Sequence, residues 1–230
     1  MNYKKKFSSE LALLLGILLN SFCVSLMVKS NFGISTISSV PFVLSDIFSK
    51  FSFGFWNFLI QSASILILII VTKKFKIGYL ISFVIAVIFS ELLDLDKIIL
   101  ASWPNTLNWR IIYFVVAFFV LTYGASLFIK CKLPILPFDT FVRDMTQYLK
   151  VPVKRVKTSF DLVCLTITLA FSLAMLGYID GVGLGTILCA IFTGIITNHV
   201  CDYLEHHYSF QPTIYVVKKI LYHGKPIQTK

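Results

Sequence analysis

Long apolar runs dominate the pattern of hydrophobic and polar positions along this chain. A helix needs about 20 apolar residues to cross the hydrocarbon layer of a bilayer, and six windows come close to that length. These windows cover residues 10 to 28, 54 to 72, 77 to 95, 109 to 129, 157 to 177 and 183 to 204. The pattern therefore predicts an all-α polytopic membrane protein with six transmembrane helices and with the lipid bilayer as part of its solvent.

Two further segments, residues 33 to 48 and residues 134 to 149, are too short and too polar to cross a membrane. The second carries Asp139, Arg143 and Asp144, and ionised side chains are costly in hydrocarbon. Each segment opens near a residue that breaks helices. We therefore expect both segments to form short half-helices within the membrane or on its face.

A faint internal repeat divides the chain into two halves. The segment SLMVK at residues 25 to 29 recurs as SLFIK at residues 126 to 130, and a helix break follows each copy, at Gly33 and at Pro134. Because each half contains three crossings, an odd number, the second half enters the bilayer from the opposite side. Inverted repeats with broken helices are the architecture of many secondary transporters. The sequence therefore predicts two inverted three-helix repeats, each with a short broken or half-helix.

This repeat gives the chain five parts. Residues 1–9 form a basic amino-terminal segment, residues 10–95 the first three-helix repeat, and residues 96–108 a loop on the outer face. The second repeat covers residues 109–204, and a basic tail covers residues 205–230. Since the first apolar run is long enough to span the bilayer and to stay there, we expect no cleaved signal peptide.

Charge supports the same layout. The chain has 21 Lys and Arg against 11 Asp and Glu, a formal net charge of +10. Of the 21 basic residues, 17 fall on one side of the six-span layout, including Lys218, Lys219, Lys225 and Lys230 in the tail. By the positive-inside rule that side is cytoplasmic. We therefore expect a multi-pass protein of the cell membrane with both termini in the cytoplasm. Because the basic residues flank apolar segments, we expect no nucleic acid partner.

Sequence motifs give no sign of a cofactor, a metal or an enzyme. The five cysteines lie in or beside apolar runs without a CxxC spacing, which argues against disulfides and structural zinc. Only His199, Asp202 and His206 have a spacing along one helix face that suits a metal, and such a cluster is more often a solvated helix end. HExxH, GxSxG and P-loop motifs are missing. We expect no cofactor, no metal and no enzymatic activity.

Three segments resemble the YczE/YyaS/YitT group of bacterial integral membrane proteins. They are KSNFGIS at residues 29 to 35, PILPFD at residues 134 to 139 and GLGTI at residues 183 to 187. The chain departs from the group's repeated segment in having Thr36 and Ser38 where Pro and Asp are typical. The resemblance implies a multi-pass protein of the bacterial cell membrane. It says little about activity, since the group is largely uncharacterised.

Polar side chains at membrane depth indicate a candidate substrate site. Such groups face the bundle interior or a wet cavity, because lipid does not solvate them. Gln61 and Asp161 occupy equivalent positions in the two repeats, which places both near the pseudo-symmetry axis and the helix breaks. We predict that a cavity opens there between the halves. Its wall is expected to include Asn20, Ser35, Gln61, Asp139 and Asp161.

These residues also have an ordinary interpretation. Asp161 stands four residues after Lys157, so the two form an ion pair on one helix face. Ser35 or Asp139 caps its half-helix. If these structural roles account for the polar side chains, no substrate site follows from them.

The inverted repeat favours a transporter of a small polar or anionic solute that works by alternating access. The exposed N–H groups at the start of a half-helix carry partial positive charge and suit an anion. A carboxylate becomes a reasonable ligand if Lys29 and Lys130 lean into the same space. Otherwise both lysines extend to the membrane interface.

The alternative is a membrane substrate-capture or regulatory subunit that acts with a partner protein. Small residues recur at four-residue spacing, as in Ala12 with Gly16 and Gly181 with Gly185, and such residues allow close helix packing in lipid. The chain also loosely resembles the substrate-capture subunits of vitamin-type importers. Packing within the monomer, a membrane partner subunit and a homodimer are therefore all open.

Overall fold

The computed structural model describes residues 4 to 213, most of which are helical. In chain order the elements are β1 (Lys5–Ser8), α1 (Ser9–Ser30), α2 (Thr36–Ile47), α3 (Phe53–Thr72), α4 (Ile77–Ala101), α5 (Leu107–Lys130), α6 (Pro137–Leu149), α7 (Val153–Phe171), the π-helical turn η1 (Ser172–Leu176), α8 (Leu184–His207) and β2 (Tyr208–Gln211). Within the described residues, six helices are long and apolar enough to cross a membrane, with α7 and η1 counted as one. The prediction of six spans and two half-helices, α2 and α6, is confirmed. The tail lysines from Lys218 onwards lie outside the described residues.

Local sequence signals set where several helices begin and end. The Ser35 hydroxyl accepts a hydrogen bond from the Ser38 N–H (3.4 Å) at the start of α2, and the Ser52 hydroxyl accepts one from the Phe55 N–H (3.0 Å) at the start of α3. These side chains satisfy N–H groups that have no partner within the helix. At the other end of α1, Asn31 adopts the left-handed conformation with a φ of 55° and closes the helix.

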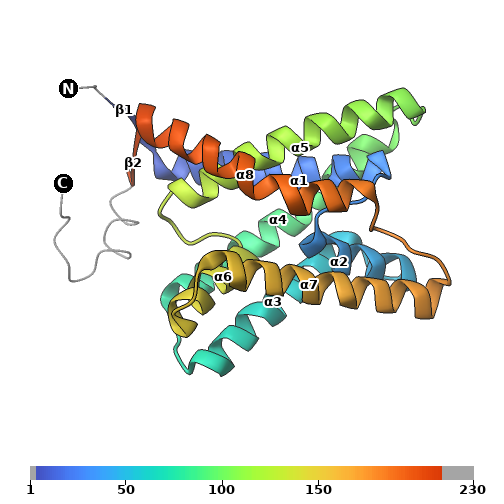
Figure 1. The fold of residues 1–230 in the computed structure, drawn as a ribbon, viewed down its shortest axis with the longest axis horizontal. Helices are drawn as coiled ribbons and strands as arrows, with labels where there is room; N and C mark the ends of the chain where they lie inside the picture. Colours follow the sequence, from blue (N-terminus) through green and yellow to red (C-terminus); the bar gives the residue numbers. More distant parts are fainter. Residues whose placement is uncertain (1–3, 214–230) are drawn as a thin grey trace.

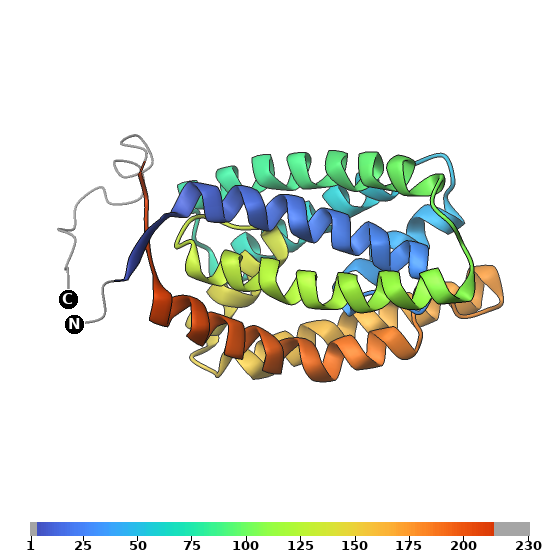
Figure 2. The same ribbon diagram turned by 90° about the horizontal axis from the view of Figure 1, so that it is seen from above.

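The helices form two layers (Figure 1). One layer contains α1, α5 and α8, and the other contains α2, α3, α6 and α7, with α4 crossing behind them. The long helices run lengthwise through the molecule, so its two ends correspond to the two faces of the membrane. Viewed at right angles, α4 lies at one edge of the molecule beside α1 (Figure 2).

The packing follows a two-fold relation between α1 to α4 and α5 to α8. α1 packs on α4 as α5 packs on α8, α2 packs on α7 as α6 packs on α3, and α1 and α5 pack on each other. In Figure 1, α1 and α4 run away from the end that carries β1, whereas α5 and α8 run towards it. The two three-helix repeats are therefore inverted, as predicted.

The crossing of α1 and α5 forms the centre of the main core. Gly16 of α1 faces the ring of Phe128, and Gly124 of α5 faces the amide of Asn20, so closely that a Cβ atom on either glycine would clash. Small residues let helix backbones approach in lipid. The four-residue spacing of Ala12 and Gly16 is thus explained by packing within the chain.

The two-fold relation breaks at one pair of helices. α3 packs along α4, where the Asn57 amide donates to the Ser90 hydroxyl at 3.1 Å and the Gly54 N–H donates to Asp94 at 2.8 Å. The equivalent helices α7 and α8 make almost no contact with each other. Lys157, which stands where α3 has Asn57, is exposed. The second repeat is therefore the looser of the two.

Both ends of the described chain lie at the same end of the molecule. β1 and β2 pair there in parallel, with Lys5 opposite Tyr208 and Ser8 opposite Gln211. The connections from α3 to α4 and from α6 to α7 lie at that end too (Figure 1). These connections are basic. The basic segments thus gather at one membrane face, as the charge pattern predicted.

Candidate functional site

The half-helices α2 and α6 start near the middle of the molecule and run towards opposite ends (Figure 1). α2 starts after a break in which Gly33 has a φ of 102°, and α6 starts at Pro137, whose ring suits the first position of a helix. Free N–H groups give each start a partial positive charge. Two positive helix ends therefore face the interior, from opposite sides.

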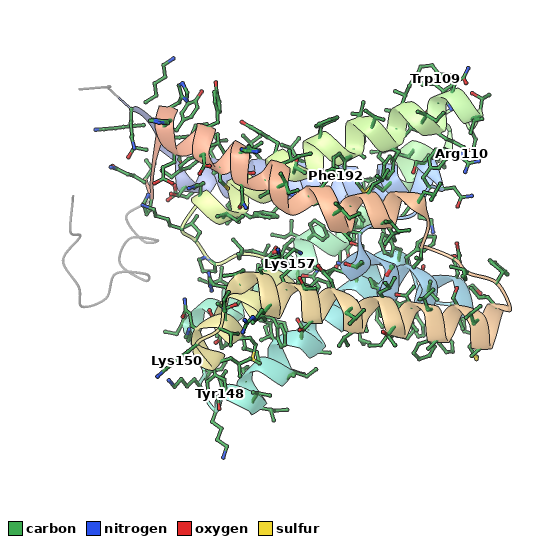
Figure 3. The ribbon with its side chains drawn as sticks, viewed as in Figure 1. Trp109, Arg110, Tyr148, Lys150, Lys157 and Phe192 are labelled. Atoms are coloured by element: carbon green, nitrogen blue, oxygen red, sulfur yellow. The ribbon has the colours of Figure 1, made fainter. Side chains whose placement is uncertain are left out.

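Asp161 of α7 binds at the start of α2. Its Oδ1 accepts a hydrogen bond from the Thr36 hydroxyl at 2.9 Å, and its Oδ2 lies 3.5 Å from the Lys157 ammonium. Figure 3 shows Lys157 near the middle of the molecule, on the side of α7 towards the other layer. Asp161 therefore forms the ion pair with Lys157 and also contacts the first half-helix through Thr36.

Asp139 is the third residue of α6. Its side chain is exposed, although many protein atoms surround it. Loss of hydration raises the pKa of Asp139 and the Asp161 carboxylate raises it further, whereas the charges of Lys157 and Arg143 oppose this rise. Two carboxyl groups and a lysine therefore share the space between the half-helix ends. Such a group can bind a polar solute and can exchange a proton with it.

Gln61 of α3 is the equivalent of Asp161 in the first repeat. Its side chain is 1% exposed, and its Oε1 atom has no hydrogen-bond partner among the described residues. Its helix α3 packs on the second half-helix α6, as α7 packs on α2. A buried amide oxygen without a partner is costly in a protein interior. It offers an acceptor to a bound solute or water.

The other two predicted site residues have structural contacts. Ser35 caps α2, and its hydroxyl also lies 3.0 Å from that of Ser38. The Asn20 amide donates to the Gly16 carbonyl at 2.7 Å within α1 and fills the crossing with α5. Of the five predicted residues, Asp139 and Asp161 lie close together, Ser35 adjoins them through Thr36, and Asn20 lies in the α1–α5 core.

A network around Asp144 fixes the second half of α6. The Asp144 carboxylate accepts from the Lys76 ammonium (2.7 Å), the Tyr79 hydroxyl (2.8 Å) and the Arg143 guanidinium (3.0 Å). Burial raises the pKa of Asp144, but these three donors outweigh burial and hold the pKa below its usual range. Lys76 and Tyr79 stand at the start of α4. The network therefore ties the half-helix α6 to the first repeat.

The loop before α8 closes over the break before α2. The Ile34 N–H donates to the Gly181 carbonyl at 3.2 Å, and the Gly185 N–H donates to the Phe32 carbonyl at 2.7 Å. A Cβ atom on Gly183 would lie 2.5 Å from the Phe32 carbonyl oxygen. Gly183 and Gly185 are therefore required because a Cβ atom on either would clash with the Phe32 carbonyl oxygen. A cavity of about 140 Å³ lies beneath this loop.

A second carboxyl pair lies at the same end of the molecule. Asp46, at the end of α2, shares a hydrogen bond with Asp180 of the loop. Burial raises the pKa of Asp46 to about 7, with the Asp180 hydrogen bond and charge adding to the rise and Lys97 opposing it. A cavity of about 460 Å³ is lined by Asp46 and Lys97. Neither cavity is lined by any of the five predicted site residues.

Sequence reasoning missed this second pair. Asp46 and Asp180 come from different repeats, and nothing in their local sequence links them. Thr36 was noted in the sequence only as a departure from the repeated segment of the YczE/YyaS/YitT group, although it is the residue that contacts Asp161. Its place one residue after a capping serine is the signal that could have indicated it.

Residues 7–202 match a family model described as "Family of unknown function (DUF6198)". A protein of Haemophilus influenzae described as "Uncharacterized protein" is 27% identical over 171 residues, which cover 72% of this chain and 72% of that protein. No solved structure matches the chain. These comparisons support a family relation and name no activity.

Proposed function

Because this chain belongs to the DUF6198 family, whose function is unknown, the case for an activity rests on its own geometry, and we propose that it is a secondary transporter of a small polar solute. It works by alternating access, with one repeat rocking against the other. Its place in the bacterial cell membrane, with both termini cytoplasmic, is part of this proposal, as is its closer relation to the YczE/YyaS/YitT group.

One observation carries the proposal. The starts of two half-helices from inverted repeats face the interior, and Asp161 joins α7 to one of them through Thr36. Transporters with inverted repeats bind substrates where broken helices meet near the bilayer midplane. Side chains from both repeats therefore meet at one place. A relative movement of the repeats changes access to that place from the two sides.

The charges around this site favour a polar solute over a simple anion. Asp161 already occupies the positive end of α2, so an anion would have to displace a carboxylate that is bound there. Lys157 and Asp139 add a donor and a titratable acceptor. The site therefore suits a solute with hydrogen-bond donors and acceptors, or with charges of both signs. The raised pKa of Asp139 suits proton coupling.

The test is transport by the purified protein in proteoliposomes, with a pH gradient and a panel of labelled amino acids, polyols and short carboxylic acids as probes. We expect Asp161→Asn to lower the rate about tenfold, the equivalent of about 1.4 kcal/mol, because an amide keeps the volume and loses the charge. Asp202→Asn, at an exposed carboxylate of α8, is the matched control and should transport normally.

Normal transport by Asp161→Asn would return Asp161 to the role of an ion-pair partner for Lys157. If the wild-type protein binds a probe but moves none, the second candidate function applies, a substrate-capture or regulatory subunit. One observation favours that candidate. The spans α7 and α8 are poorly covered, and a Cβ atom on Gly194 would meet nothing within 4 Å. A partner subunit fits such a face.

A further inference from the structure

The loop between η1 and α8 contains a compact turn, which covers the helix break before α2. The Ser172 hydroxyl accepts a hydrogen bond from the Asp180 N–H at 2.7 Å and donates one to the Tyr178 carbonyl at 2.9 Å, so it holds the turn together. Gly177 and Gly181 flank the turn with left-handed φ values of 77° and 69°. Glycines at such positions can absorb a rotation of the backbone. The turn can therefore move as a unit.

This turn rests on the first repeat over a cavity. The Gly181 carbonyl accepts a hydrogen bond from the Ile34 N–H at 3.2 Å, and the Asp180 carboxyl shares a hydrogen bond with Asp46 at the end of α2. The cavity of about 140 Å³ beneath the loop is lined by Ile34 and Asp180 among others. A segment that rests on a cavity has fewer packing contacts to lose when it moves. The Asp46–Asp180 pair therefore links a movable turn to the half-helix α2.

This link depends on a proton. Two ionised carboxylates repel each other and have no donor, whereas a pair that holds one proton has a donor and an acceptor. Lys97 of α4 and Tyr178 of the turn line the same cavity as Asp46, and the charge of Lys97 favours the ionised form. Burial and the Asp180 carboxyl outweigh Lys97 and raise the pKa of Asp46 to about 7. The hydrogen bond is therefore present below neutral pH and is lost above it.

We propose that Asp46 and Asp180 form a proton-controlled latch, which keeps the turn closed over the outer face while the pair holds a proton and lets it open when both carboxyls are ionised. This inference rests on the proposed alternating-access function. The two carboxyls come from different repeats, so the latch joins parts that must separate when the outer face opens. Ile34 beneath the turn lies two residues before Thr36, whose hydroxyl binds Asp161 at 2.9 Å. Opening of the turn therefore uncovers the break that leads to the candidate site.

The experiment measures access to a cysteine at position 34, because Ile34 is 2% exposed beneath the turn. Full-length Ile34→Cys protein in liposomes reacts with a membrane-impermeant maleimide, and its rate is divided by that of Asn105→Cys on the exposed loop between α4 and α5. This ratio removes the effect of pH on the thiol itself. We expect the ratio to rise about tenfold between about pH 5.5 and about pH 8. Met27→Cys, at a second lining position of the cavity, should give the same result. The wild type is the background control, since its five cysteines are buried.

Variants of the latch separate its two states. Asp46→Asn has an amide that donates to Asp180 at every pH, so the ratio should stay low, whereas Asp46→Ala removes the hydrogen bond and the ratio should stay high. Lys97→Gln should move the rise to higher pH, and Lys50→Gln, at an exposed lysine that does not line the cavity, is the matched control. A ratio that does not change with pH in the otherwise wild-type protein, or an Asp46→Ala variant that still responds to pH, would overturn the latch. Because labelling needs no solute, it decides on the latch even if the protein transports nothing.

Discussion

Removal of the Asp144 side chain tests how the half-helix α6 is anchored. Asp144 is 5% exposed and accepts three hydrogen bonds. In Asp144→Ala the buried Tyr79 hydroxyl loses its acceptor, which costs about 1 to 3 kcal/mol. The Lys76 and Arg143 side chains are 50% and 44% exposed, so water replaces most of their contribution, about 0 to 1 kcal/mol each.

Together these effects amount to a loss of about 2 kcal/mol, or a fall in Tm of about 4 to 8 °C for a chain of this size. Thermal unfolding of the purified protein in detergent measures it. Asp144→Asn keeps an acceptor for Tyr79 and should lose about half as much. Asp202→Ala, at an exposed carboxylate, is the control. The reasoning is refuted if adding Tyr79→Phe to Asp144→Ala restores no stability, because the unpaired hydroxyl would then not be the main cost.

The same residue gives a pH dependence. The pKa of Asp144 is lowered in the folded protein, so its contribution is present above the unfolded pKa and is lost as the pH falls through the folded one. The Tm difference between the wild type and Asp144→Ala should therefore shrink below about pH 4. A difference that grows on acidification would contradict this sign.

Three further predictions concern the loop before α8 and the topology. Because the pKa of Asp46 is raised to about 7, the hydrogen bond between Asp46 of α2 and Asp180 of the loop should be strong at pH 5 and weaken as the pH rises to about 7. Hydrogen exchange of residues 177–183 should therefore increase over this range, and Asp46→Asn should remove the pH dependence. Gly183→Ala should lower stability by roughly 1 to 3 kcal/mol, measured by thermal unfolding, because the new Cβ atom would clash with the Phe32 carbonyl oxygen. Wild-type stability in this variant would mean that the loop can shift to make room. A cysteine at Asn105 should react with an impermeant reagent in intact cells and one at Gln147 should not; the reverse result would invert the topology.

The spans could be predicted because the length of an apolar run is fixed by the thickness of the bilayer. Their ends were less predictable. The third window was expected to stop at residue 95, whereas α4 continues to Ala101. Asp94, Asp96 and Lys97 lower the hydropathy of that last part without interrupting the helix. Hydropathy therefore reports the part of a helix that lies in lipid, and hydrogen bonding decides where the helix ends.

The site was only partly predictable because its contacts join distant segments. Polarity at membrane depth selected Asp161, but its partner Thr36 comes from the other repeat. The same criterion selected Asn20. Its amide donates a hydrogen bond to the Gly16 carbonyl of its own helix and packs against Gly124 of α5. Asp161 and Asn20 are both polar residues of spanning helices, and only the packing of those helices decides that Asp161 lies beside a half-helix whereas Asn20 lies between α1 and α5.

The parallel pairing of β1 and β2 has a mechanical consequence. It fastens the beginning of the first repeat to the end of the second, while the segment between α4 and α5 joins the same two repeats covalently at the opposite end of the molecule. The two repeats are therefore joined at both membrane faces, by the strand pair at one and by the α4–α5 connection at the other. In the alternating-access cycle that we propose, either connection would act as the hinge when the opposite face opens, so a change at the strand pair should alter the movement of the repeats.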